Sequence, residues 1–85
     1  MNNLDNLRKE IDAIDEELLA LFAKRFGIVK EIGQLKKAQG IPAQNKEREG
    51  QVLKKIGEKA RQLSLNEDTA KSIWMTIFKE SYKME

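Results

Sequence analysis

The sequence predicts an all-α protein whose protomer has one long helix and two shorter ones. Over residues 4–39, apolar residues recur at alternating steps of three and four, the spacing of a helix that packs along another helix. No segment alternates with the period of two that is typical of a strand. Helix-breaking residues near positions 40–42 and 63–66 divide the 85 residues into three helical segments of one domain, residues 1–85.

The first helix is expected over about 4–39. Asn3 or Asp5 is suited to cap its start, and Gly40 followed by Pro42 ends it. Roughly 35 residues at 1.5 Å each extend about 52 Å, whereas a compact chain of this length is about 30 Å across. The helix therefore extends beyond a compact monomer, and a second copy of the chain is the simplest way to bury its apolar residues, so we expect a homodimer. These residues, called the seam below, are Leu4, Leu7, Ile11, Ile14, Leu18, Leu21, Ile28, Ile32 and Leu35.

The second and third helices are expected over about 46–62 and about 67–84. Asn45 is a suitable N-cap for the second helix. For the third, either Ser64 forms a capping box with Glu67 or Asn66 is the cap. The inner face of the second helix is Val52, Leu53, Ile56 and Ala60, and that of the third is Ala70, Ile73, Trp74, Ile77, Phe78 and Ser81.

Arg25 occupies a position in the seam where an apolar residue is due. A guanidinium in such a place needs anions, supplied by the chain or by a ligand. Lys36 follows eleven residues later, about 20° around the helix and about 16 Å along it, so the two cations share a face that suits a small anion. A role in coiled-coil register, or an ion pair with Glu31, is the alternative for Arg25.

Other polar residues lie beside the apolar faces. Arg8 precedes Arg25 by about 25 Å, so it reaches the same ligand only from an antiparallel partner, in a site shared between subunits. Arg8 and Lys36 also suit interhelical ion pairs. The remaining candidates are Arg48, Glu49, Ser81 and Glu85. Each also has an ordinary structural explanation: Arg48 and Glu49 form a charged first turn, Ser81 can bond its own helix, and Glu85 is at a chain end that can fray.

Composition excludes several classes of function. The chain has no cysteine and no histidine, so thiolate or imidazole metal ligands and imidazole bases are absent, and we expect no metal site. Its 16 basic and 14 acidic residues are interspersed, which argues against nucleic-acid binding. No signal-peptide core or membrane-length apolar run occurs, so we expect a soluble, cytoplasmic protein without membrane partners.

An ordered set of short segments resembles the all-helical, bacterial-type chorismate mutases over essentially the whole chain. The set is Leu7-Arg8, Ala23-Lys24-Arg25, Gly33-Gln34-Leu35-Lys36, Ile41-Pro42 and Glu47-Arg48-Glu49. The resemblance implies an intertwined dimer of three-helix protomers whose two active sites each receive an arginine from the partner. It also implies the rearrangement of chorismate, a dicarboxylate, to prephenate in phenylalanine and tyrosine biosynthesis, without a cofactor.

The resemblance also implies a role for each candidate residue. Arg8 of the partner and Arg25 bind carboxylates, and Lys36 contacts the ether oxygen and a carboxylate. Arg48 shapes the anionic pocket, Glu49 accepts from the ring hydroxyl, Ser81 contacts the ring carboxylate region and Glu85 faces the ether oxygen. The chain departs from the family in two places: Asn45 stands where aspartate is frequent, and Glu85 where the bacterial enzymes have glutamine.

Two alternatives stay open at this point. An isochorismate pyruvate lyase has the same fold, although an acid at the position of Glu49 favours the mutase. A non-catalytic helical dimerisation or regulatory module, such as a domain cut from a larger fused enzyme of aromatic biosynthesis, would also explain the seam.

Overall fold

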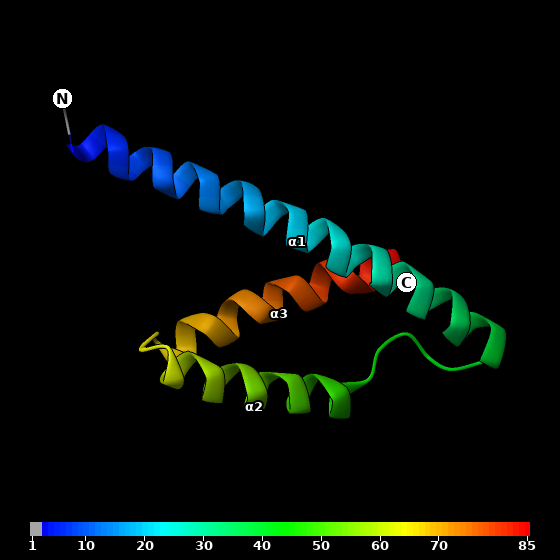
Figure 1. Cartoon of the computed structure of the whole chain (residues 1–85). Helices are drawn as coiled ribbons and strands as arrows, with labels where there is room; N and C mark the ends of the chain where they lie inside the picture. The colour runs from blue at the N-terminus through cyan, green and yellow to red at the C-terminus, as the bar shows by residue number, and fades with distance from the viewer. Residues whose placement is uncertain (1–2) are drawn as a thin grey trace.

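A computed structural model describes residues 3–85, which form three α-helices (Figure 1). Helix α1 spans Asn3–Gln39, α2 spans Lys46–Gln62 and α3 spans Glu67–Met84. These bounds agree with the expected ranges within one residue, and no strand occurs among residues 3–85, so the all-α prediction is confirmed. None of the helices in the described part of the chain has the length and apolarity needed to cross a membrane.

The same hydrogen-bonded motif ends α1 and α2. At the end of α1, Gly40 has a φ of +69°, and the Ile41 N–H donates to the Lys36 carbonyl at 2.8 Å. At the end of α2, the residue in the left-handed conformation is Ser64 (φ 59°), and the Leu65 N–H donates to the Ala60 carbonyl at 2.8 Å. Both are Schellman turns, in which glycine is favoured at the residue with the left-handed conformation. Only the turn that ends α1 has a glycine at that residue.

Side-chain caps begin α2 and α3. The Asn45 Oδ1 accepts from the Arg48 N–H at 3.0 Å, which confirms the predicted cap of α2. The Asn66 Oδ1 accepts from the Thr69 N–H at 2.8 Å. Asn66 is therefore the cap of α3, and the capping box starting at Ser64 does not form because Ser64 belongs to the turn that ends α2.

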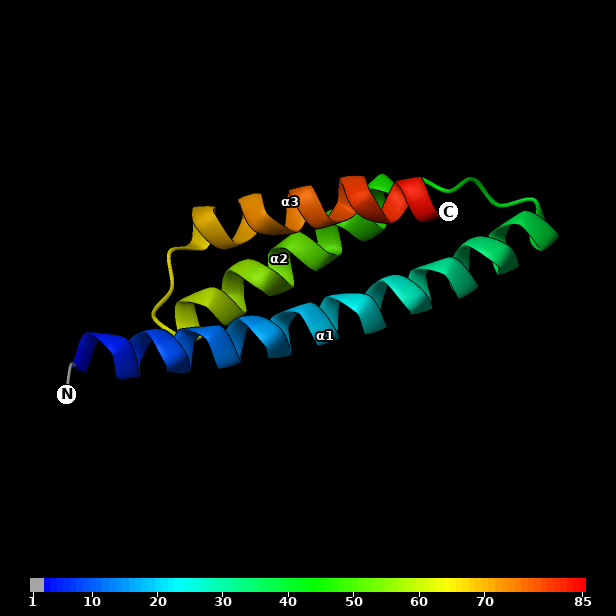
Figure 2. The same cartoon turned by 90° about the horizontal axis from the view of Figure 1, so that it is seen from above.

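The three helices leave a thin core. Helices α2 and α3 form a hairpin, while α1 meets α3 near the C-terminal end of α3 (Figures 1 and 2). The longest extent of the protomer is 59 Å and its radius of gyration is 16.4 Å, against about 12 Å for a compact chain of this length. The buried apolar side chains are only Ala60, Ala70, Ile77 and Phe78 among residues 3–85.

The seam of α1 is not covered within one protomer. Every seam residue is at least 42% exposed, including Ile28, Ile32 and Leu35 beyond the middle of α1. Ile73, predicted on the inner face of α3, is also 48% exposed, so the apolar face of α3 is wider than the surface that one protomer buries. The protomer therefore exposes a continuous apolar stripe along α1.

Candidate functional site

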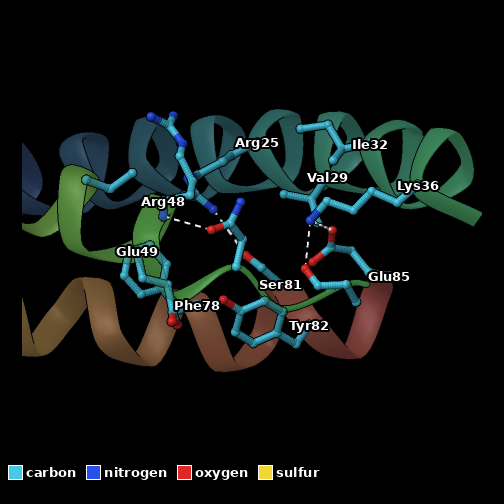
Figure 3. Close-up of a pocket in the computed structure, with 13 residues that line it drawn as sticks. Arg25, Val29, Ile32, Lys36, Arg48, Glu49, Phe78, Ser81, Tyr82 and Glu85 are labelled. Carbon is cyan, nitrogen blue, oxygen red and sulfur yellow. Dashed lines mark hydrogen bonds and ion pairs between the residues drawn. The ribbon is translucent and has the colours of Figure 1, made fainter. Parts of the chain in front are cut away.

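A pocket of about 260 Å³ lies where the second half of α1, the start of α2 and the end of α3 meet (Figure 3). It brings together residues far apart in the sequence, from position 25 to position 85. Seven of the eight candidate site residues line it, and Arg8 is the exception. The lining consists of Arg25, Val29, Ile32, Lys36, Ala43, Asn45, Arg48, Glu49, Val52, Phe78, Ser81, Tyr82 and Glu85.

Arg25 points from α1 across the pocket toward α3 (Figure 3). Its Nη1 donates to the Ser81 Oγ at 3.1 Å, and the Ser81 Oγ donates to the Ile77 carbonyl at 2.9 Å. Ser81, 7% exposed, thus bonds its own helix and also orients the arginine. No ion pair joins Arg25 to Glu31 or to any other carboxylate of residues 3–85. The guanidinium charge is met by a neutral hydroxyl and keeps donors for an anion.

Lys36, which lines the same pocket, is fixed by two acceptors. Its Nζ donates to the Ala43 carbonyl at 2.7 Å and to the Glu85 Oε1 at 2.8 Å. The Glu85 side chain is only 6% exposed and the Lys36 side chain 22%, so both are packed within the protomer. An ammonium group has three donors, and these contacts use two of them. The third remains for a ligand.

The first turn of α2 forms the wall opposite α1. Asn45 lines the pocket and uses its side chain as the cap of α2. Arg48 is exposed and Glu49 is half-buried, and both line the pocket. The cation and the carboxylate at this end therefore lie within reach of one small molecule.

Tyr82 was not among the residues expected at the site, although it lines the pocket. Burial raises the pKa of Tyr82 from 10.0 to about 12, with further contributions from a hydrogen bond with Glu49 and from the charge of that carboxylate. The phenol is therefore a neutral donor at neutral pH. Its position three residues before Glu85, a spacing that shares one helix face, was the available signal.

Arg8 lies outside this pocket, on the exposed first half of α1. Seventeen residues of helix place it about 25 Å from Arg25. A single protomer therefore does not bring Arg8 to this pocket.

The pocket is suited to a small polar anion that also carries a hydroxyl group. Three cations, Arg25, Lys36 and Arg48, approach it from two helices, and two carboxylates, Glu49 and Glu85, can accept hydrogen bonds. No group of three or more acidic side chains in residues 3–85 is placed to bind a metal ion. The chemistry that this donor set supports is binding, orientation and electrostatic stabilisation.

Comparison with known proteins gives the family. The profile described as Chorismate mutase type II matches residues 7–85. The T-protein of Haemophilus influenzae is 35% identical over 85 residues, all of this chain and 22% of that protein. The chorismate mutase of Methanocaldococcus jannaschii is 26% identical over 85 residues, covering 86% of its length.

A solved structure agrees with these relatives. Chorismate mutase (form I) from Thermus thermophilus superposes with a TM-score of 0.88 and 30% identity, covering 94% of this chain and 99% of that one. The chain spans only about a fifth of the length of the T-protein. Since the family profile nevertheless covers all but its first six residues, the chain belongs to the chorismate mutase type II family.

Proposed function

We propose that the chain catalyses the rearrangement of chorismate to prephenate as a homodimer with shared active sites. One observation carries the proposal: Arg25, Lys36 and Arg48 converge on a single pocket that also holds two hydrogen-bond-accepting carboxylates, in a chain of this family. Chorismate has two carboxylates, a ring hydroxyl and an ether oxygen. Each has a chemically matched group in or beside the pocket.

The reaction is an intramolecular pericyclic step. A C–O bond of the enolpyruvyl ether breaks while a C–C bond forms, and no atom is gained or lost. The protein has to hold the flexible enolpyruvyl arm over the ring and to stabilise the negative charge that grows on the ether oxygen. A pocket of fixed cations, already oriented by Ser81, Ala43 and Glu85, suits both tasks.

In this proposal, the two ends of the pocket have different roles. At the reacting end, Arg25 binds a carboxylate and Lys36 donates its free N–H to the ether oxygen, beside Glu85. At the other end, Glu49 accepts from the ring hydroxyl. The groups that complete the binding of the substrate are Asn45 and Arg48 from the start of α2, Ser81 near the ring carboxylate, and Arg8 from the partner.

The proposed dimer is supported by the exposed seam and by the position of Arg8. The first half of α1 carries six seam residues that are each at least 45% exposed in the protomer. If a second copy packs antiparallel along α1, its Arg8 comes alongside the half of α1 that carries Arg25 and Lys36. The same interface then buries the seam and completes the site.

The direct test is product analysis with two substrates. Incubation of the chain with chorismate should yield prephenate, whereas an isochorismate pyruvate lyase would release pyruvate and salicylate from isochorismate. The presence of Glu49 at the pocket favours the mutase. Release of pyruvate and salicylate without prephenate formation would replace the proposal by the lyase.

A thermal-shift experiment separates an enzyme from a non-catalytic dimerisation module. A bicyclic dicarboxylate that mimics the transition state should raise the melting temperature, and Arg25→Leu should abolish that shift. In a non-catalytic module, the ligand has no effect, and Arg25→Leu raises the melting temperature by itself because it removes an unpaired charge.

Two features of the biological setting belong to the same proposal. A step of aromatic amino acid biosynthesis is expected in the cytoplasm. Fusion to another enzyme of that route is supported by the T-protein, in which the matching segment is 22% of the whole.

A further inference from the structure

We propose that Gly33 is a positioning residue for the reacting end of the site, because its missing side chain lets the last turn of α3 lie directly on α1 and brings the Glu85 carboxylate to Lys36. The inference rests on the proposed function for its catalytic consequence. Its structural part, the link from Gly33 to the ion pair, stands independently of the reaction.

The space around Gly33 requires glycine. A Cβ built on Gly33 would lie 2.9 Å from the Glu85 Cα, 3.2 Å from its Cγ and 3.3 Å from its Cβ. The nearest of these atoms belongs to the backbone, which cannot turn aside as a side chain can. Ordinary carbon contacts are about 3.5–4.0 Å, so an alanine would push the end of α3 away by about 0.6 Å or more.

The backbone conformation of Gly33 does not explain the glycine. Gly33 lies inside α1 without a positive φ, unlike Gly40. Glycine in a helix interior lowers helix stability relative to alanine. Gly33 is also the buried residue of α1 among those described. The glycine therefore lowers the stability of α1 but allows Glu85 to approach α1 closely.

The other helical glycines show that this contact is specific. Gly27, on the same helix, has no atom within 4 Å of its would-be Cβ. Gly57 of α2 would meet the Glu67 Oε1 at 2.7 Å and the Lys71 Cε at 2.8 Å, but these are ends of flexible side chains that can move. Among the glycines in residues 3–85, only Gly33 has a backbone atom, the Glu85 Cα, within 3.0 Å of the Cβ that alanine would add.

The contact leads directly to the reacting groups. Lys36 follows Gly33 by three residues, so both lie on neighbouring positions of one helix face. Glu85 ends α3, where its N–H donates to the Tyr82 carbonyl at 3.3 Å. From there its carboxylate reaches the Lys36 Nζ at 2.8 Å (Figure 3). A displacement at Gly33 therefore changes the distance between the two groups that face the ether oxygen.

The test compares Gly33→Ala with the matched control Gly27→Ala. Misplacement of a catalytic group by about 1 Å costs up to about 100-fold in rate. Gly33→Ala should lower kcat by 10- to 100-fold and change KM less than threefold, while Gly27→Ala should stay within twofold of the parent in both. An unchanged kcat in a folded Gly33→Ala protein would overturn the inference.

A double-mutant cycle with Glu85→Ala separates positioning from general damage. In the Glu85→Ala background, Gly33→Ala should change kcat less than twofold, because the displaced carboxylate is already gone. The melting temperature should still fall, since the added methyl group still crowds the backbone of residue 85. An equal drop in kcat in both backgrounds, or a Gly33→Ala protein that does not fold, would show a purely structural role and overturn the inference.

A spectroscopic readout keeps the inference separate from the proposed function. In a ¹H–¹⁵N spectrum of lysine ammonium groups, the Lys36 signal should be protected from solvent exchange in the parent and in Gly27→Ala, and broadened in Gly33→Ala. This result can be obtained even if the protein lacks mutase activity. A protected signal in all three proteins, or in none of them, would overturn the positioning role.

Discussion

The two halves of α1 carry the same seam but have different surroundings. All residues from 3 to 21 are exposed in the protomer. Beyond them the helix contacts α3, and residues such as Phe22, Phe26 and Val29 become half-buried, with the rings of Phe22 and Phe26 stacked at 6.3 Å between centroids. The second half thus has a face for α3 in addition to the seam.

This difference shows how one helix can serve two purposes. In the second half, the face toward α3 carries Arg25, Gly33 and Lys36, and the seam beside it stays exposed. In the first half, the seam residues are exposed in the protomer, and Arg8 lies beside them. Stability and function are both expected to depend on the first half of one copy meeting the second half of the other.

The largest effect is expected from a charge placed in the seam. Ile14→Asp places a carboxylate in the centre of the proposed interface, and it does so twice per dimer. We expect the dimer dissociation constant, measured by sedimentation equilibrium, to rise by at least about 10³-fold. The control Lys9→Glu adds the same kind of charge on the opposite face of α1 and should leave the dimer intact. An unchanged dimer in Ile14→Asp would exclude the seam as the interface.

The second prediction tests whether the two halves meet in one site. Arg8→Ala and Arg25→Ala should each lower kcat/KM by about 100-fold or more, since each removes a charged contact with substrate. In heterodimers both lesions fall in the same site, so an equal mixture after subunit exchange should recover about a quarter of the parent activity. Failure to recover activity would remove Arg8 from the partner's site.

The third prediction concerns Glu85 at the reacting end. An ionised carboxylate cannot donate to the ether oxygen, whereas a glutamine amide can at every pH. Because Glu85 is ion-paired with Lys36, Glu85→Gln should exceed the parent by about tenfold in kcat/KM. Equal kcat/KM values for the two proteins would show that residue 85 donates nothing to the oxygen.

The fourth prediction compares the two Schellman turns. Gly40 and Ser64 both adopt a positive φ, but only glycine does so without steric cost. Ser64→Gly should raise the free energy of unfolding by about 1 kcal/mol, and Gly40→Ala should lower it by about 1 kcal/mol. Urea unfolding measures both. Equal effects of the same sign would contradict the role of the left-handed conformation.

The fifth prediction concerns stability at alkaline pH. The pKa of Tyr82 is raised from 10.0 to about 12, so the folded protein keeps the phenol proton more firmly than the unfolded chain. This contribution to stability is complete below pH 10 and is lost as pH rises from 10 toward 12. Urea midpoints should therefore fall less over this range in Tyr82→Phe than in the parent. Parallel curves would show that Glu49 and burial do not act on this phenol.

The sequence reveals much of this protein because its helices are locally encoded. The period of the seam, the cap at Asn45 and the break at Gly40 depend on residues within a few positions of one another, so they can be read without a fold. The grouping of Arg25 with Lys36 also follows from helix geometry alone. Each polar residue taken singly is equally compatible with a structural role, and the order and spacing of the whole set favoured a binding site.

Contacts between helices could not be read in the same way. Tyr82, the Ala43 carbonyl and the approach of Glu85 to Gly33 depend on where α1 crosses α3, and no local pattern encodes that point. The choice between Ser64 and Asn66 as cap was decided by the turn that ends α2. The exposure of Ile73 likewise depends on what one protomer leaves uncovered.

The sequence by itself determined three helices, their ends, the apolar seam that no monomer of this length can bury, and the cations that share its faces. These follow from helix periodicity, capping and chain length, which are properties of neighbouring residues. Only the tertiary structure decided that seven of the eight candidate residues line one pocket and that Glu85 reaches Lys36. The physical reason is the crossing of α1 and α3, whose closest approach depends on the space left at Gly33.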